Sequence, residues 1–515
     1  MSLSRRNAIG LMAAAPAILV KRAAASVPAG VEIQKGPFEG TRSSLEKYQV
    51  PNWFRDAKFG IWAHWGPQSA PEAGDWYARN MYIQGHEQYK YHVEHYGHPT
   101  KFGFKDVIPT WKGDKFDAEH LMALYKKAGA KYFFSMGVHH DNFDLWNSKH
   151  NQWNSVKMGP KKDIVGLFAR AARKQGMKFG VSEHLWISYK WFATSHGSDK
   201  TGDMAGKPYD GADPKFASLY HDAQCEPFSN GKFEWDAAGV PDSWKLHWFQ
   251  RIKDLLDNYQ PDLLYTDGAL PFEEYGLNLV AHHYNQNAKR HGGVTQAVYN
   301  TKRPEDCETG TCVLDLERSI VDKIWAKPWQ TDTCVGNWHY KRNIQYKSPK
   351  TVIDMLCDIV SRNGNLLLNF PLPNSGWPDD EELKILAEIT KWMAVNSEGI
   401  YSTRPWKIYG DGPATGDKGK GRFNERGRKT LSAADVRFTT KGKTIYAFVM
   451  GWPEKEAVIK PLGTSSEQAP GKVANVELLG HKARCGWKQE AEGLKVQLPP
   501  EKPSEHAVTF KVTLA

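Results

Sequence analysis

The sequence predicts an α/β fold, a (β/α)8 barrel, followed by an antiparallel β-sandwich domain. Helices that stop at a glycine or a proline are followed by short apolar strands, and this order recurs along the chain. Polar residues gather where these strands end, and the carboxyl ends of the strands are where barrels of this kind carry their functional residues. After residue 404 the pattern changes to short strands of period two, which predicts a separate β domain.

The strand expected at 263–266 is the centre of the predicted barrel. Its sequence, Leu-Leu-Tyr-Thr, is followed by Asp267 and then by Gly268. A carboxylate at the exit of a buried strand is unfavourable unless it is paired or used. Capping of the following turn is the alternative role for Asp267. Other strand ends carry polar clusters in the same position, and this repetition favours a functional role.

Three earlier strands share this layout. We expect them at 59–63, 132–138 and 178–181, with Asp117 and Asp163 as N-caps of the helices between them. The polar or aromatic residues at these strand ends, or in the loop after the first strand, are His64, Asp75, Trp76, His139, His140, Asp141, Ser182, Glu183 and His184. We expect their side chains to meet at one end of the barrel.

The rest of the chain supplies further elements. We expect helices at 116–129, 164–175, 244–259, 352–361 and 379–396, and barrel strands at 293–299, 312–316 and 365–370. Residues 328–334 read as a loop at a strand end, and 196–240 as an inserted loop region. In the β domain we expect a hairpin of 436–439 and 444–450, and strands at 473–479, 494–498 and 507–514.

The first 25 residues have the features of an export signal. Arg5 and Arg6 form a twin-arginine pattern, the apolar run 8–20 is too short to span a bilayer, and the alanines at 23–25 offer a cleavage site. A mitochondrial-type presequence is disfavoured because the apolar run is continuous. We therefore expect a signal peptide over 1–25, bacterial export to the periplasm or beyond, a barrel over 26–404 and a β-sandwich over 405–515.

Composition limits the possible partners. Of the net charge of +10, four positive charges lie in the first 25 residues, so the remainder is mildly basic and permits an acidic substrate such as a sulfated glycan. There is no nucleic-acid motif and no further membrane segment. The 20 Trp and 21 Tyr suit stacking against sugar faces, although most should lie in the core.

Cysteine usage predicts neither a metal site nor a disulfide-held fold. Six cysteines are few for 515 residues, and their spacing does not match a zinc motif. Cys307 and Cys312 are close enough for a local disulfide, which export would permit. We expect no metal and no cofactor.

Taken together, the strand-end motifs resemble glycoside hydrolase family 29, the α-L-fucosidases. The matching pieces are 57–66, 76–82, 139–146, 153–156, 159–163, 265–268, 364–369 and 396–406. They cover nearly all of the proposed barrel, and their order and spacing are more specific than any one of them. A β domain after the barrel also fits the architecture of the family.

The resemblance implies a retaining exo-hydrolase that removes terminal α-L-fucose from oligosaccharides or polysaccharides. It implies Asp267 as the nucleophile, and His64, His139, His140 and Trp76 as sugar contacts. A retaining glycosidase also needs an acid/base carboxyl group roughly 5–5.5 Å from the nucleophile. In this family the acid/base lies on a variable loop. Our choice for it is Glu317, and the alternatives are Glu308 and Glu305.

Two positions depart from the family pattern. Asp75 stands where the family often has Glu, one methylene longer, and the segment 182–184 stands where it often has Tyr. Lys302 and Arg303 are both candidates for the position of a family Arg that contacts the substrate. Glu183 is either a sugar contact or a partner of His184.

Other functions stay open at this point. An exo-glycosidase for a fucose-like or galactose-type unit of a sulfated polysaccharide would fit the departures at Asp75 and Ser182. A catalytically inactive carbohydrate-binding protein would bind without turnover. A metal-dependent hydrolase built on His139, His140 and Asp141 is disfavoured, because adjacent residues of one strand rarely converge on one ion.

Overall fold

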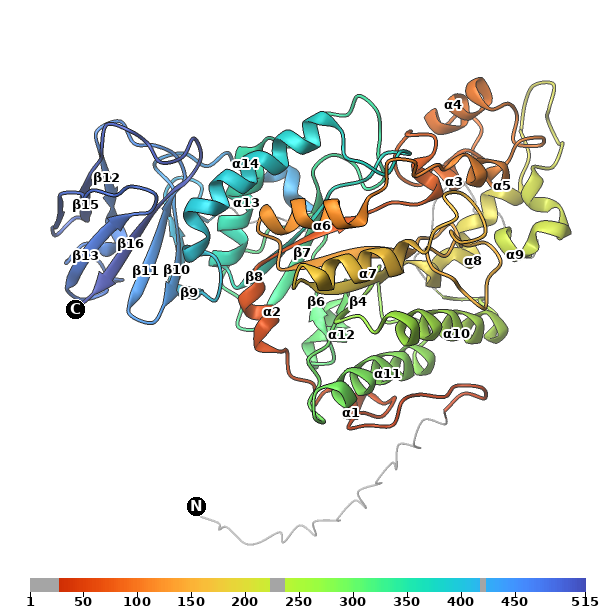
Figure 1. The fold of residues 1–515 in the computed structure, drawn as a ribbon, viewed down its shortest axis with the longest axis horizontal. Coiled ribbons are helices and arrows are strands. Elements are labelled where there is room, and N and C mark those ends of the chain that lie inside the picture. Colours follow the sequence, from red (N-terminus) through yellow and green to blue (C-terminus); the bar gives the residue numbers. More distant parts are fainter. Residues whose placement is uncertain (1–26, 223–236, 417–422) are drawn as a thin grey trace, which may run out of the picture.

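The computed structural model describes residues 27–222, 237–416 and 423–515 (Figure 1). The proposed signal peptide and Cys225 lie outside these ranges. The described chain forms an eight-stranded parallel sheet surrounded by helices, and then a region of antiparallel sheets at one end of the molecule (Figure 1). The predicted fold class is confirmed.

The eight-stranded sheet is a nearly closed barrel. Its strands are β1 (Phe59–Ala63), β2 (Tyr132–Val138), β3 (Lys178–Glu183), β4 (Leu263–Thr266), β5 (Val298–Thr301), β6 (Val313–Leu314), β7 (Trp329–Cys334) and β8 (Gly364–Asn369). They lie in the order β6-β5-β4-β3-β2-β1-β8-β7. At the seam between β6 and β7, the bridge Asp315–Gln330 and a 2.9 Å hydrogen bond from the Leu316 amide to the Gln330 carbonyl close the barrel.

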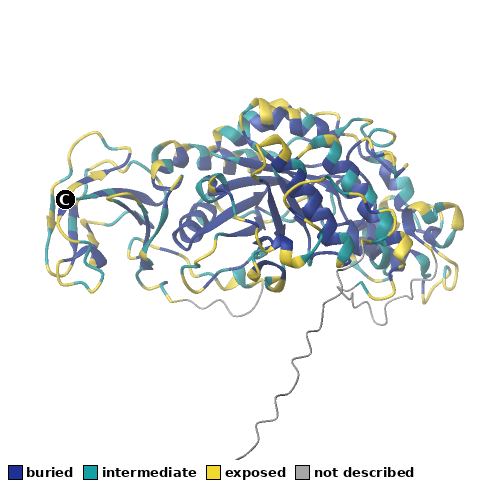
Figure 2. Cartoon of the chain, turned by 90° about the horizontal axis from the view of Figure 1, so that it is seen from below, coloured by how far each residue is buried: buried dark blue, intermediate teal, exposed yellow. Residues whose placement is uncertain are grey.

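Helices cover the outside of the barrel, and their inner faces are buried (Figure 2). The longer ones are α4 (Glu87–His95), α6 (Ala118–Lys127), α7 (Ile164–Lys174), α10 (Asp242–Tyr259), α11 (Glu274–Arg290), α13 (Pro349–Ser361) and α14 (Asp380–Asn396). The short ones are α1 (Arg42–Leu45), α2 (Asn52–Ala57), α3 (Tyr77–Asn80), α5 (Phe104–Val107), α8 (Ser188–Trp191), α9 (Ala217–Tyr220) and α12 (Pro304–Glu308). Asp117 and Asp163 cap α6 and α7 as predicted. Among the described helices, none is long and apolar enough to cross a membrane.

One expectation for the barrel needs correction, and one helix was not predicted. Residues 328–334 are not a strand-end loop, because Trp329–Cys334 forms the fully buried strand β7. Its polar side chains hid it from a pattern based on hydrophobicity. Inside the barrel Gln330 donates a hydrogen bond to Asp315 at 2.7 Å and Thr331 donates one to the Leu316 carbonyl at 2.6 Å. The seventeen-residue helix α11 was also not expected.

The C-terminal region is a sandwich of two antiparallel sheets. The larger has the order β13-β16-β11-β10-β9 and the smaller β12-β15-β14. Their strands are β9 (Arg404–Asp411), β10 (Val436–Lys441), β11 (Thr444–Val449), β12 (Glu456–Ile459), β13 (Val473–Leu478), β14 (Trp487–Gln489), β15 (Leu494–Gln497) and β16 (Val508–Leu514). Side chains from both sheets share one apolar core, and the predicted hairpin of β10 and β11 is present.

The two regions meet where α13 packs against β9 and β10. Asp358 of α13 is buried there among three guanidinium groups. It accepts hydrogen bonds from Arg437 at 2.6 Å, from Arg428 at 3.0 Å and from Arg362 at 3.0 Å. Burial would raise the pKa of Asp358, but these three cations lower it well below its usual value.

Candidate active site

A cavity of about 430 Å³ opens at the carboxyl ends of the barrel strands. This volume lies in the range of about 300–1,000 Å³ that is typical of small-molecule binding sites. The lining residues that the sequence predicted are His64, Asp75, Trp76, His139, His140, Asp267, Lys302, Arg303 and Glu317. His184, which the sequence also placed at a strand end, lines the cavity as well, and lining residues found only from the structure include Trp62, Trp186, Asp332, Trp338 and Phe423.

Asp267 lies at the exit of β4 and faces a cluster of nitrogen atoms. Its carboxylate is 2.5 Å from Nζ of Lys302, 3.2 Å from Nδ1 of His184 and 3.4 Å from Nε2 of His140. Burial would raise the pKa of Asp267, but Lys302 and the two imidazoles lower it well below its usual value. The carboxylate is therefore ionised and available as a nucleophile at neutral pH.

Glu317 follows β6 at the barrel seam. It is paired with the ammonium group of Lys302 and accepts a 3.0 Å hydrogen bond from Nε1 of Trp338. Burial raises the pKa of Glu317 to about 7, assisted by the nearby carboxylates of Asp332 and Asp267 and opposed by Lys302. A carboxyl group with this pKa can give up or take a proton near neutral pH.

The Lys302 ammonium bridges Asp267 and Glu317. Two oxygens that bond to one nitrogen lie no farther apart than about 6 Å, so the carboxyl groups of Asp267 and Glu317 are close neighbours. Burial would lower the pKa of Lys302, but Asp267, Glu317 and Asp332 raise it well above its usual value. Lys302 therefore stays charged. The adjacent Arg303 also lines the cavity, but its side chain is exposed.

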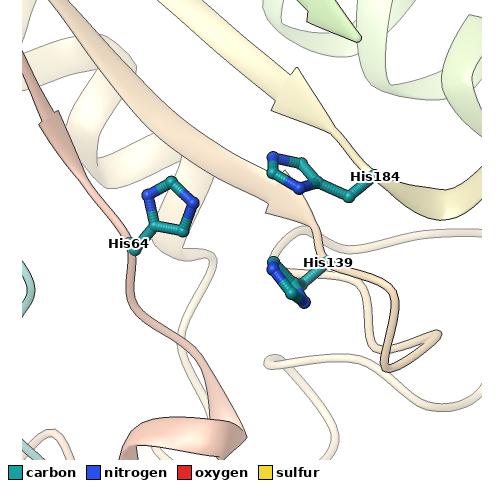
Figure 3. A group of neighbouring side chains, drawn as sticks. All are labelled: His64, His139 and His184. Atoms are coloured by element: carbon teal, nitrogen blue, oxygen red, sulfur yellow. The ribbon is translucent and has the colours of Figure 1, made fainter. Parts of the chain in front are cut away.

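Three histidines from adjacent strands lie side by side in the lining of the cavity: His64 follows β1, His139 follows β2 and His184 follows β3 (Figure 3). Nδ1 of His64 lies 3.2 Å from Oδ1 of Asn369, and Nδ1 of His139 lies 2.8 Å from Nε2 of Gln68. Burial lowers the pKa of His64 and His139 well below the usual value, and that of His184 to about 4. Neutral imidazoles can donate to or accept from sugar hydroxyls.

Several groups in this cavity are close enough to hold a metal ion. In the described ranges they are His64 with His139 and His184, Asp75 with His139 and His339, and His140 with His184 and Asp267, each with ligand atoms within 4.8 Å of one another. Asp141, which the sequence offered as a metal ligand with His139 and His140, belongs to none of these three groups. Burial raises the pKa of its carboxyl group to about 6.

Asp75 is held by a histidine that the sequence did not indicate. Nδ1 of His339 donates to the Asp75 carboxylate at 2.6 Å, and Nε2 of His139 lies 3.9 Å from the same oxygen. His339 and Trp338 lie in the loop after β7, so assigning that strand to a loop concealed them. Trp76 follows Asp75 in the left-handed region, with φ 61°, and its ring lies edge-on to His140.

The structure places three of the predicted candidates outside the cavity lining. Glu183 is fully buried behind Asp267 and accepts hydrogen bonds from Trp248 at 3.0 Å, Thr266 at 2.8 Å and the Leu185 amide at 3.1 Å. Glu305 and Glu308 are exposed on α12. The predicted Cys307–Cys312 disulfide is present beside them.

Family models decide the classification. Residues 25–398 match the model described as alpha-L-fucosidase, and residues 429–514 match the model of the alpha-L-fucosidase C-terminal domain. The chain belongs to the α-L-fucosidase family. This membership confirms the resemblance drawn from the strand-end motifs and makes the chain a member of a glycoside hydrolase family.

Curated relatives of the family align with almost the whole chain. Tissue alpha-L-fucosidase of Bos taurus is 26% identical over 493 residues, which cover 91% of this chain and 90% of the relative. Plasma alpha-L-fucosidase of Homo sapiens is 26% identical over 479 residues, covering 90% and 88%.

Solved α-fucosidase structures share the fold. The Thermotoga maritima alpha-fucosidase in complex with a mechanism-based inhibitor superposes with a TM-score of 0.71 at 24% identity, covering 93% of this chain and 100% of that one. The alpha-L-fucosidase isoenzyme 1 from Paenibacillus thiaminolyticus gives 0.63 at 19% identity, covering 92% and 99%.

Proposed function

We propose that this protein is a retaining exo-α-L-fucosidase that works through a covalent glycosyl-aspartate intermediate. The observation that carries the proposal is the Lys302 ammonium between Asp267 and Glu317. It holds the two carboxyl groups close together, which supports a retaining mechanism, and keeps Asp267 ionised, while burial leaves Glu317 protonatable near pH 7. Relatives named as α-L-fucosidases support fucose as the sugar.

In the first step Asp267 attacks the anomeric carbon, and the bond from that carbon to the leaving oxygen breaks. Glu317 gives its proton to the leaving oxygen, so the aglycone departs as an alcohol. In the second step Glu317 takes a proton from water, and the resulting hydroxide displaces Asp267. Two displacements at one carbon retain its configuration.

The other lining residues hold the sugar. The neutral imidazoles of His64, His139 and His184 bind hydroxyl groups, and Trp76 offers a ring to an apolar sugar face. Relatives named as α-L-fucosidases support the removal of terminal fucose as the reaction. We propose fucose-containing oligosaccharides or polysaccharides as substrates, including sulfated ones, because the exposed guanidinium of Arg303 lines the cavity.

The deciding experiment is steady-state kinetics on 4-nitrophenyl α-L-fucoside, with the wild type beside Asp267→Ala. We expect turnover by the wild type and a loss of at least about 10³-fold in the variant. Azide should partly restore activity by entering the space of the lost carboxylate, giving fucosyl azide of inverted configuration. Wild-type levels of turnover by Asp267→Ala would refute the proposed nucleophile.

A galactose-type sugar is the second candidate, supported by the position of Asp75. The shorter carboxylate is held by His339 at the cavity wall, which alters how far it reaches toward a sugar hydroxyl. A panel of aryl glycosides separates the two candidates. Cleavage of the galactoside without cleavage of the fucoside would favour this second candidate, whereas binding without any turnover would favour an inactive sugar-binding protein.

We also propose export through the twin-arginine route, supported by Arg5, Arg6 and the apolar run after them. Replacing both arginines by lysine should leave the protein in the cytoplasm. Cell fractionation of a bacterial host tests this, and unchanged export of the double variant would contradict it.

A further inference from the structure

A segment of the C-terminal region reaches back to the barrel and brings an aromatic ring to the active-site cavity. Phe423 belongs to the connection between β9 and β10 of the sandwich, yet it lines the cavity with Glu317 and Arg303. Phe423 is 57% exposed, and it is the one aromatic residue among the exposed large apolar residues of the described ranges. Because this exposed phenyl ring lines the cavity, it is placed to contact a ligand there.

Hydrogen bonds fix this segment to the chain directly after Glu317. The Phe423 amide donates to Oγ of Ser319 at 3.2 Å, and that hydroxyl donates to the Glu317 carbonyl at 2.7 Å. Oδ1 of Asn424 accepts from the Ile320 amide at 2.6 Å, and the Glu425 amide donates to the Arg318 carbonyl at 2.8 Å. Phe423 is thus held on the side of the cavity where Glu317 lies.

Further contacts keep the segment in place. The carboxylate of Glu425 accepts a 2.5 Å hydrogen bond from Oγ1 of Thr333 on β7 and pairs with Lys347 at 2.7 Å. Phe423 itself adopts φ 58°, a left-handed conformation that non-glycine residues keep only where the surroundings hold them. The backbone is therefore fixed while the ring stays uncovered.

We infer that Phe423 forms the binding site for the leaving group, stacking on the ring that is attached to the fucose. This inference rests on the proposed function, because it takes Glu317 as the acid. The acid must touch the leaving oxygen, so the leaving group lies on the Glu317 side, where Phe423 is exposed. The partner is a pyranose or aryl ring, since either presents an apolar face to the phenyl ring.

The test compares substrates with and without a ring in the leaving group. α-L-Fucosyl fluoride loses only fluoride and cannot contact Phe423. 4-Nitrophenyl α-L-fucoside carries a ring in its leaving group. A fucosyl disaccharide does so too, and the one used is that which the wild type cleaves fastest from a panel. The readout is the ratio of kcat/KM for each ring substrate to kcat/KM for the fluoride.

For Phe423→Ala we expect this ratio to fall about three- to tenfold, the size of a lost aromatic contact. Phe423→Trp should preserve the ratio because it keeps a ring at the same position. Val458→Ala, which truncates an exposed apolar residue elsewhere in the C-terminal region, is the matched control and should not change it.

An unchanged ratio in Phe423→Ala would overturn the inference, even if kcat/KM fell for both substrates. An equal loss of kcat/KM with fucosyl fluoride would mean that Phe423 acts by holding the 317–320 segment and not by contacting the leaving group. Failure of the proposed function is distinguishable. In that case the wild type itself would not cleave fucosyl fluoride.

Discussion

Lys302 pairs with both carboxyl groups of the proposed catalytic pair, Asp267 and Glu317, so replacing it should change the pH dependence as well as the rate. In Lys302→Met the pKa of Asp267 loses the cation that lowers it most, and the acid limb of kcat/KM should move to higher pH. We expect the maximum rate to fall about 10²-fold, as when an electrostatic donor is removed. Rates on 4-nitrophenyl α-L-fucoside across pH measure both effects.

Lys302→Arg keeps the positive charge and should keep the acid limb near its wild-type position. Lys384→Met removes an exposed lysine from α14 and serves as the control for the loss of one cation. If the acid limb stays in place in Lys302→Met, then Lys302 does not control the ionisation of Asp267.

Glu317 should set the alkaline limb of activity. Its raised pKa, about 7, means that the proton needed by the leaving oxygen is present below that pH and lost as pH rises through it. Activity on fucosyl disaccharides should therefore fall above about pH 7. Glu317→Gln should lose this limb, and it should lose far more activity on disaccharides than on fucosyl fluoride, whose leaving group needs little protonation.

An alkaline limb that persists in Glu317→Gln would assign the acid to another group. Glu305→Gln and Glu308→Gln are the matched comparisons, since they change exposed carboxylates of α12 that do not line the cavity. We expect both to keep the wild-type profile.

At the scale of elements, the Asp358 cluster joins α13 to the C-terminal sheet. Asp358→Asn leaves the buried guanidinium groups of Arg437 and Arg362 without their carboxylate, which should lower the free energy of unfolding by about 3–5 kcal/mol. Because the folded pKa is lowered, the stabilisation is full above the unfolded pKa of about 4 and is lost as pH falls through the folded pKa.

Thermal unfolding at neutral pH, followed by calorimetry, measures this effect. Asp203→Asn, on an exposed turn, is the control and should unfold at the wild-type temperature. An Asp358→Asn protein as stable as the wild type would show that the cluster does not hold the two regions together.

Elements with a clear hydrophobic pattern could be predicted closely from the sequence. Strands β2 and β4 have the predicted bounds because each is an apolar run between turn signals. The strand β7 could not be predicted in this way, because its buried residues Gln330, Thr331 and Asp332 are polar. The hydrogen bonds that make their burial possible form only in the folded barrel. Satisfied polar groups inside a barrel leave no mark on hydrophobic periodicity.

The candidate site was predictable to the same extent. His64, His139 and Asp267 follow recognisable strands, so their convergence on one cavity could be expected. His339 and Trp338 could not, since they depend on the strand that was missed. Phe423 lies more than a hundred residues beyond Glu317 in another structural region, and only the tertiary structure places it at the cavity.

In the whole molecule, the barrel seam and the C-terminal region both contact the chain segment that carries Glu317. Glu317 follows β6, at the seam with β7. Residues 423–425, between β9 and β10, form hydrogen bonds with residues 318–320 directly after Glu317. The sandwich is therefore more than an appended domain, because it completes one side of the cavity that the barrel strands begin.

In the proposed mechanism Asp267 forms a covalent bond to the sugar, and a slow substrate can trap that bond. A 2-deoxy-2-fluoro-α-L-fucosyl fluoride should react once and then hydrolyse slowly, because the fluorine at C2 destabilises the oxocarbenium-like transition state of both steps while the fluoride leaves readily. Mass spectrometry of the digested protein should locate the added fluorofucosyl group on Asp267. A label on another carboxylate, or turnover of the reagent without any labelled protein, would contradict the account.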